Sequence, residues 1–188
     1  MDEPLTVDEL TVLHTVAICG TPTPDDVGAF GGDTASVDRL VERALVRFDD
    51  RIARYKLTPD GRALHRSLAG DREGETLTLR LHYAEFRKLD RRCKQLCTDW
   101  QLTPDAAVID RLVDWRQEAD ALLDRLAIVN DRFSVHRRRI TDAVERVRGG
   151  DHTAFTGVWC ASVHDVWMVL HEDLVLTLGI DRRTENDE

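Results

Sequence analysis

The sequence predicts a mainly α-helical protein that carries one short β-hairpin near its N-terminus. Apolar residues recur at helical spacing along most of the chain, which is typical of amphipathic helices. Residues 46–57 depart from this pattern, because two short runs of strand-forming residues flank the turn Asp49-Asp50. Beyond residue 76 the helical periods are long and no strand pattern occurs. These features indicate a mixed N-terminal domain followed by an all-helical one.

The length of 188 residues indicates one sizeable domain or two small ones. The chain is 42% hydrophobic and 32% charged, a composition that can form a hydrophobic core. The longest apolar runs reach about five residues, which is too short to cross a bilayer. The N-terminal stretch MDEPLTVDEL is acidic and lacks the basic region of a signal peptide. We therefore expect a cytoplasmic protein with no membrane partner, whose four cysteines are reduced thiols.

Three helices are expected before the hairpin, and N-capping residues mark their starts: Thr6, Thr23, and Asp33 or Thr34. Glu9 completes a capping box with Thr6, and the first helix should end at Gly20. The residues expected to face the core from the first and third helices are Leu10, Leu13, Val16, Ala17, Val37, Leu40, Val41, Ala44 and Leu45.

The hairpin should begin with Val46-Arg47-Phe48 and return along Arg51 to Leu57. A fourth helix follows at once, because Thr58 is a good N-cap and Pro59 suits the first helical position. The predicted order is helix, helix, helix, strand, strand, helix within about 65 residues.

The stretch LVERALVRFDDRIARYKLTPDGRALH resembles winged-helix bacterial regulators of the MarR and PadR kind. The helix end LVERALV, the short charged hairpin and LTPDGRAL carry the resemblance, which covers about residues 6–68. It implies a winged helix-turn-helix domain over residues 1–70 that binds double-stranded DNA, with the hairpin as a two-stranded β-wing. The implied function is transcriptional regulation.

In that family the third helix enters the DNA major groove. The resemblance then implies DNA contacts from the outward face of this helix and from the wing: Thr34, Ser36, Arg39, Arg43, Arg51, Arg54 and Lys56. Arginine can bind guanine edges bidentately, and hydroxyl groups can donate to phosphates. Residues 34–66 hold eight Lys or Arg and five Asp or Glu, so this window is basic within a chain of net charge −9.

Several acidic residues favour a different use of the same fold. Asp38 and Glu42 lie on the third helix and could pair with its arginines, and Asp49-Asp50 at the hairpin tip would repel phosphate. The alternative is therefore a winged-helix protein-interaction module that regulates a partner enzyme.

Residues 71–188 are expected to form the second domain, with the boundary in the stretch SLAGDREGET at residues 67–76. Four helical periods follow, at about residues 78–100, from Thr103-Pro104-Asp105, from Asn130 to Gly149-Gly150, and at about residues 155–178. Long helices joined by short loops indicate a domain like an antiparallel four-helix bundle. In a regulator such a domain makes a homodimer, senses a small-molecule effector, or does both.

The last expected helix places Cys160, His164, Trp167 and His171 on one stripe. The segments CTDWQ and HDVWMVLHEDL are similar to segments of actinobacterial proteins of the MarR kind, and less closely to segments attached to phosphoenolpyruvate-handling dikinase-like enzymes.

Three interpretations of this stripe remain open. The first is an ordinary helical core with satisfied histidines and buried thiols. The second is an effector pocket formed by Asp99, Trp100, His164, Trp167, His171 and Glu172. The third is a zinc site formed by Cys93, Cys97, Cys160 and His164.

The common enzyme signatures are missing from the sequence. It contains no G-x-S-x-G, no H-E-x-x-H and no phosphate-binding P-loop. Paired glycines precede Asp33 and Asp151, where we expect them to end helices. We therefore expect no catalytic activity, no cofactor and no resident metal.

Overall fold

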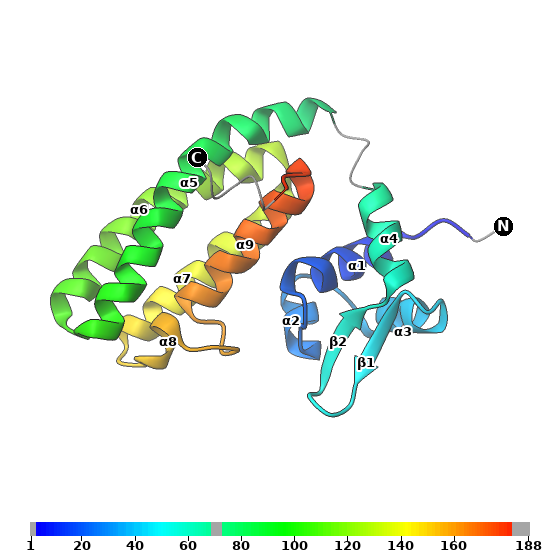
Figure 1. Ribbon diagram of the computed structural model, residues 1–188, viewed down its shortest axis with the longest axis horizontal. Coiled ribbons are helices and arrows are strands. Elements are labelled where there is room, and N and C mark those ends of the chain that lie inside the picture. The colour runs from blue at the N-terminus through cyan, green and yellow to red at the C-terminus, as the bar shows by residue number, and fades with distance from the viewer. Residues whose placement is uncertain (1–2, 69–72, 182–188) are drawn as a thin grey trace. The chain divides into compact units, whose positions relative to one another are not determined.

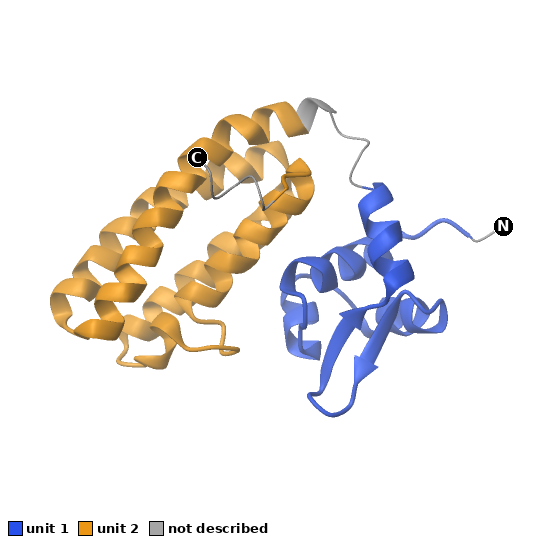
Figure 2. Ribbon diagram, viewed as in Figure 1, with its two compact units in different colours: residues 1–71 blue, residues 72–188 orange. Residues whose placement is uncertain are grey.

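A computed structural model describes residues 3–68 and 73–181, except for the side chains of residues 73–75. The chain is mainly helical, with one two-stranded antiparallel sheet among the described residues. It divides into two compact units, Met1–Asp71 and Arg72–Glu188, which Figure 2 shows in different colours. The boundary expected at residue 70 lies outside the described residues. Within those residues, no helix has both the length and the apolar character that a membrane span requires.

The first unit contains four helices and one hairpin among its described residues (Figure 1). In chain order they are α1 (Val7–Cys19), α2 (Pro24–Ala29), α3 (Thr34–Glu42), β1 (Val46–Asp49), β2 (Arg54–Leu57) and α4 (Pro59–Leu68). The strands pair from Val46↔Leu57 to Asp49↔Arg54. The predicted order of elements is thus confirmed, but the return strand begins at Arg54 and not at Arg51.

Side-chain caps fix the helix starts in the first unit. The Thr6 and Thr23 hydroxyls accept from the backbone N–H groups of Glu9 and Asp26, each in a complete capping box. The Asp33 carboxylate caps α3, which settles the choice between Asp33 and Thr34. Capped short helices surround a core of Val12, Leu13, Val16, Val27, Val37, Leu40, Leu45, Val46 and Leu57.

Three residues expected in this core are exposed instead, namely Leu10, Val41 and Ala44. The third helix is also shorter than its apolar spacing predicts, because α3 ends at Glu42 and Ala44 has a positive φ of 55°. Leu45 is nevertheless buried, since the chain turns back toward the core before β1 begins.

The second unit consists of four long helices that pack around one core (Figure 1). They are α5 (Glu73–Leu102), α6 (Ala106–Val129), α7 (Ser134–Arg148) and α9 (Val163–Leu178). A 3-10 turn, Asp131–Phe133, precedes α7, and the short α8 (Thr153–Thr156) packs against α5, α7 and α9. Two starts differ from expectation: α5 begins at Glu73, and Asp105 rather than Thr103 caps α6.

The continuous last helix expected over residues 155–178 is wrong. The chain leaves α8 at Gly157, forms a loop, and starts α9 at Val163 behind the N-cap Ser162. Cys160 therefore lies in a loop and does not share a helical stripe with His164, Trp167 and His171.

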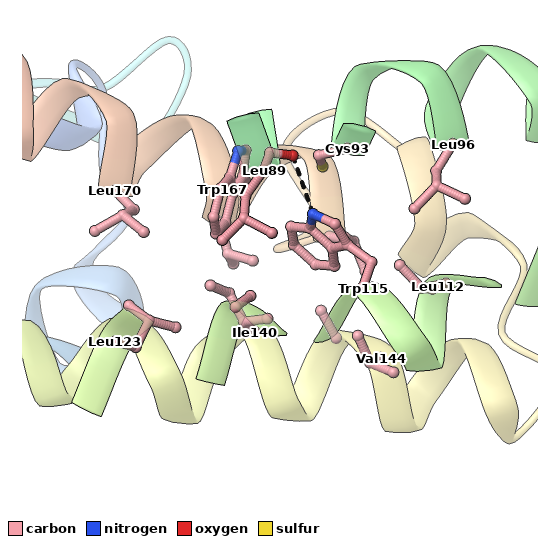
Figure 3. Packing of buried hydrophobic residues seen from close by; sticks show 14 of the residues in the cluster. Leu89, Cys93, Leu96, Leu112, Trp115, Leu123, Ile140, Val144, Trp167 and Leu170 are labelled. Carbon is pink, nitrogen blue, oxygen red and sulfur yellow. Dashed lines mark hydrogen bonds between the residues drawn. The ribbon is translucent and has the colours of Figure 1, made fainter. Parts of the chain in front are cut away.

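Aromatic side chains form the centre of this core (Figure 3). Trp115 and Trp167 meet edge to face with ring centroids 4.8 Å apart, and Phe86 stacks on Trp167 at 4.9 Å. The indole N–H of Trp115 donates to the Leu89 carbonyl at 3.0 Å, so this fully buried ring leaves no polar atom unpaired.

Candidate nucleic-acid interface

Ser36 lies at the start of α3 but does not face outward. It is completely buried, and its Oγ donates to the capping carboxylate of Asp33 at 3.0 Å and accepts from Arg39 Nη2 at 3.0 Å. Its backbone N–H also donates to Asp33, at 2.8 Å. The prediction that Ser36 contacts DNA is therefore wrong, because the hydroxyl is used inside the helix cap.

Arg39 and Arg43 are held by an acidic residue of a different helix. Arg39 Nε lies 2.7 Å from Glu9 Oε1 and Arg43 Nη1 lies 3.9 Å from Glu9 Oε2, whereas the sequence suggested Asp38 and Glu42 as partners. The Thr6 backbone N–H and the Arg39 guanidinium lower the pKa of Glu9, which is therefore held in its charged form. The Arg39 side chain remains 46% exposed, so it can still meet an outside anion.

The solvent face of α3 carries mixed charge. Its exposed residues are Thr34, Ala35, Asp38, Arg39, Val41 and Glu42. Arg43 is half-buried, and its Nη2 donates to the Glu3 carbonyl at 2.9 Å. Thr34 and Arg39 are thus the predicted contacts that α3 leaves exposed.

The hairpin uses two of its cations for its own structure. Lys56 Nζ lies 2.8 Å from Asp49 Oδ2, and this ion pair lowers the pKa of Asp49. Arg54 Nη1 donates to the Thr21 carbonyl at 2.8 Å. Arg47 and Arg51 are exposed, and sequence reasoning missed Arg47, although it precedes the turn by two residues.

The aromatic and histidine residues expected to form an effector pocket are spread along the contacts of α5 with α8 and α9. Trp100 stacks on Phe155, Trp167 donates to Asp90, and His171 approaches the Tyr83 hydroxyl at 3.3 Å. Tyr83 and Trp100 are 17 positions apart on α5, a rise of about 25 Å. These side chains therefore do not surround one ligand-sized space.

The three polar members of the expected pocket are also separated. Asp99 binds Gln95 and Arg111, so it points toward α6. His164 lies beside Asp165, which raises the pKa of the imidazole, and Glu172 is half-buried on α9. Trp100, Trp167 and His171 instead belong to the buried core, as the first of the three interpretations predicted.

Cys93, Cys97, Cys160 and His164 do not assemble a zinc site. Cys93 hydrogen-bonds to Cys97, which raises the pKa of Cys93 and lowers that of Cys97. Across the described ranges 3–68 and 73–181, no three His, Cys, Asp or Glu side chains are placed to hold a metal ion.

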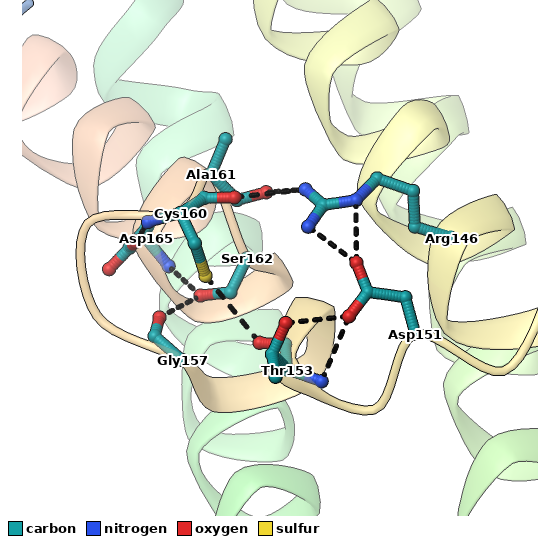
Figure 4. Close-up of polar contacts among 8 residues, drawn as sticks. All are labelled: Arg146, Asp151, Thr153, Gly157, Cys160, Ala161, Ser162 and Asp165. Atoms are coloured by element: carbon teal, nitrogen blue, oxygen red, sulfur yellow. Dashed lines mark hydrogen bonds and ion pairs between the residues drawn. The ribbon is translucent and has the colours of Figure 1, made fainter.

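The Cys160 thiol instead belongs to a tightly bonded loop (Figure 4). Arg146 Nη1 donates to the Cys160 carbonyl at 2.9 Å, Ser162 Oγ donates to the Gly157 carbonyl at 2.6 Å, and the Cys160 N–H donates to Asp165 at 3.1 Å. These bonds hold Trp159 and Ala161 at positive φ and leave the Trp159 side chain exposed.

Comparison with models of protein families, with curated proteins and with solved structures gives no significant match to this chain.

Proposed function

We propose that the chain is a DNA-binding transcriptional regulator whose first unit is a winged helix. The observation that carries this proposal is the order α1-α2-α3-β1-β2-α4, together with the tie between the hairpin and the segment before α2. The Tyr55 N–H donates to the Pro22 carbonyl at 2.9 Å, and Arg54 reaches the Thr21 carbonyl beside it. In this reading α2 and α3 are the helix-turn-helix and the hairpin is the wing.

The proposed DNA contacts follow from which side chains are exposed. Thr34 and Arg39 on α3 would reach the major groove, while Arg47 and Arg51 would bind phosphates from the wing. Arg43, Arg54 and Lys56 would act mainly by shaping this surface, since they bind Glu3, Thr21 and Asp49 of the same unit.

For the second unit we propose homodimerisation. Support comes from its separate core, which gives it the means to act as an independent module. The four long helices would then be a four-helix bundle, a fold that dimerises readily in regulators of the kind that the sequence resembles.

The proposal is tested by measuring how fluorescently labelled duplex DNA binds the full chain at several salt concentrations. We expect affinity that falls steeply with salt, because phosphate contacts release counterions. Arg47→Gln and Arg51→Gln together should reduce the magnitude of the negative slope of log K against log salt by about 1.8. The matched control is Arg66→Gln with Arg138→Gln, which removes two exposed charges from α4 and α7. Wild-type protein without salt-dependent binding would overturn the proposal.

The internal pairing of charges favours a second candidate function. Glu9 engages Arg39 and Arg43, and Asp49 engages Lys56, while Asp38 and Glu42 remain exposed on α3. A surface of mixed charge around the exposed Val41 fits a protein partner better than a polyanion. A winged-helix protein-interaction module therefore stands as the alternative, and it predicts that DNA does not bind.

A further inference from the structure

One side of α5 carries a concentration of positive charge that the proposed interface does not use. Residues 76–102 include six Lys or Arg and three Asp or Glu. Arg80, Lys88 and Arg91 are exposed on this helix, and we call them the α5 cation row. They lie at positions i, i+8 and i+11, which places them on one face over a rise of about 16 Å.

The carboxylates of this part of α5 are neutralised away from the cation row. Glu85 pairs with Arg125 of α6, and Asp99 pairs with Arg111 of α6. Asp90 is buried and accepts from Lys94 Nζ at 2.7 Å and from the Trp167 indole N–H at 3.2 Å. Among the described side chains of α5, the three carboxylates are therefore all bound to residues outside the cation row.

Among the described residues, none of the three cations forms an ion pair with a carboxylate. Arg80 Nη2 donates to the Leu178 carbonyl at 2.9 Å, at the C-terminal end of α9. In a chain of net charge −9, the three cations give this side of α5 a local positive charge that can attract an extended anion.

We infer that the α5 cation row binds the phosphate backbone of duplex DNA, outside the α3 and hairpin contacts. The inference rests on the proposed function, which it extends by a second contact that reads no base sequence. Point charges spread over about 16 Å of one helix face can each meet a phosphate of a duplex.

The chemistry of this face argues for a polyanion rather than a protein. Exposed large apolar residues of α5 lie toward its ends, at Leu77, Leu81 and Leu102. Between them the exposed residues beside the cation row are small or polar, such as Ala84, Gln95 and Thr98. A protein interface needs a buried apolar centre, which this stretch does not offer.

The experiment compares the full chain with its Lys88→Gln/Arg91→Gln variant in binding to a long mixed-sequence DNA duplex. We expect the magnitude of the negative slope of log K against log salt to fall by about 0.9 for each lost phosphate contact, or by about 1.8 for the double variant. The Arg66→Gln/Arg138→Gln variant removes the same charge elsewhere and should keep the wild-type slope. Circular dichroism should give the same melting curve for all three proteins, because the replaced side chains are exposed.

The outcomes separate this inference from the proposed function. If the Lys88→Gln/Arg91→Gln variant keeps the wild-type slope while Arg47→Gln/Arg51→Gln lowers it, the inference is overturned and the winged-helix interface stands. The reverse result supports the cation row and contradicts the hairpin contacts. If the Lys88→Gln/Arg91→Gln variant keeps the wild-type slope but has half the wild-type mass in light scattering, the inference is overturned. The face would then bind a second copy of the chain.

Discussion

Glu9 is the residue that joins the first helix to the third. Its carboxylate accepts from the Thr6 N–H at 2.8 Å and binds Arg39, whose guanidinium also reaches Ser36. Arg39 is therefore a structural residue as well as a proposed DNA contact. Replacing it by Ala should destabilise the first unit, because a buried carboxylate would lose its main partner. A loss of DNA binding by that variant alone would not establish a DNA contact.

The ionised form of Glu9 should stabilise the fold in a pH-dependent way. Its pKa is lowered below the ordinary value of 4.5 by the Thr6 N–H and by Arg39. Its contribution is then fully present above that ordinary value and is lost as the pH falls through the lowered pKa. Denaturant unfolding between neutral and acidic pH should show a steeper loss of stability for wild type than for Glu9→Gln. The control is Glu42→Gln, which replaces an exposed carboxylate on α3. If the unfolding free energy falls equally steeply with pH for wild type and Glu9→Gln, ionised Glu9 does not stabilise the fold.

Two tryptophans of the second unit should respond oppositely to truncation. Trp167→Ala removes a fully buried ring between Phe86 and Trp115 and should cost about 3–5 kcal/mol of unfolding free energy. Trp159→Ala removes a ring that is 69% exposed and should change stability by less than about 0.5 kcal/mol. Urea unfolding followed by circular dichroism measures both. Similar losses from the two variants would show that Trp167 does not anchor the core.

The start of α4 lies close to the segment that follows α3. The Thr58 N–H donates to the Leu45 carbonyl at 3.0 Å, and the Thr58 hydroxyl donates to the Ala44 carbonyl at 2.7 Å. A Cβ added to Gly61 would lie 2.0 Å from the Leu45 carbonyl oxygen. The start of α4 can lie this close to the chain after α3 only because residue 61 has no side chain.

Two glycine substitutions test this junction. Gly61→Ala should destabilise the first unit strongly, since backbone must move to admit the methyl group. Gly28→Ala on α2 meets no atom within 4 Å and should stabilise the helix by about 0.5–1 kcal/mol. Thermal melting of both variants gives the comparison, and a Gly61→Ala protein as stable as wild type would refute the close approach.

Local sequence signals predicted most of the helices and strands, whereas the contacts between them could not be predicted from the sequence. Thr6, Thr23 and Asp33 cap their helices through residues three positions ahead, so a short sequence window contains the whole interaction. The pattern Ser162-x-x-Asp165 is a signal of the same kind that would have placed the start of α9. The Glu9–Arg39 pair and the burial of Ser36 depend on how α1 meets α3, which no local pattern encodes.

At the scale of the whole molecule, the chain joins two units that each have a core of their own. The sequence indicates that residues 34–66 are the net basic window of the chain, but several of these cations bind carboxylates of the first unit. The second unit, expected to serve only dimerisation and sensing, carries the more accessible cation row on α5. The proposed regulator would therefore read bases with its first unit and gain affinity from both.

The central claim is that α3 recognises a DNA sequence, and selection of bound duplexes from a random-sequence pool tests it most directly. The full chain at moderate salt should enrich one sequence motif over successive rounds, with two related half-sites if the protein binds as a dimer. Arg39→Lys keeps the charge beside Glu9 but loses the bidentate fork, so it should relax the motif at one position. A pool that stays unenriched for wild type, in spite of measurable binding, would contradict sequence recognition by α3.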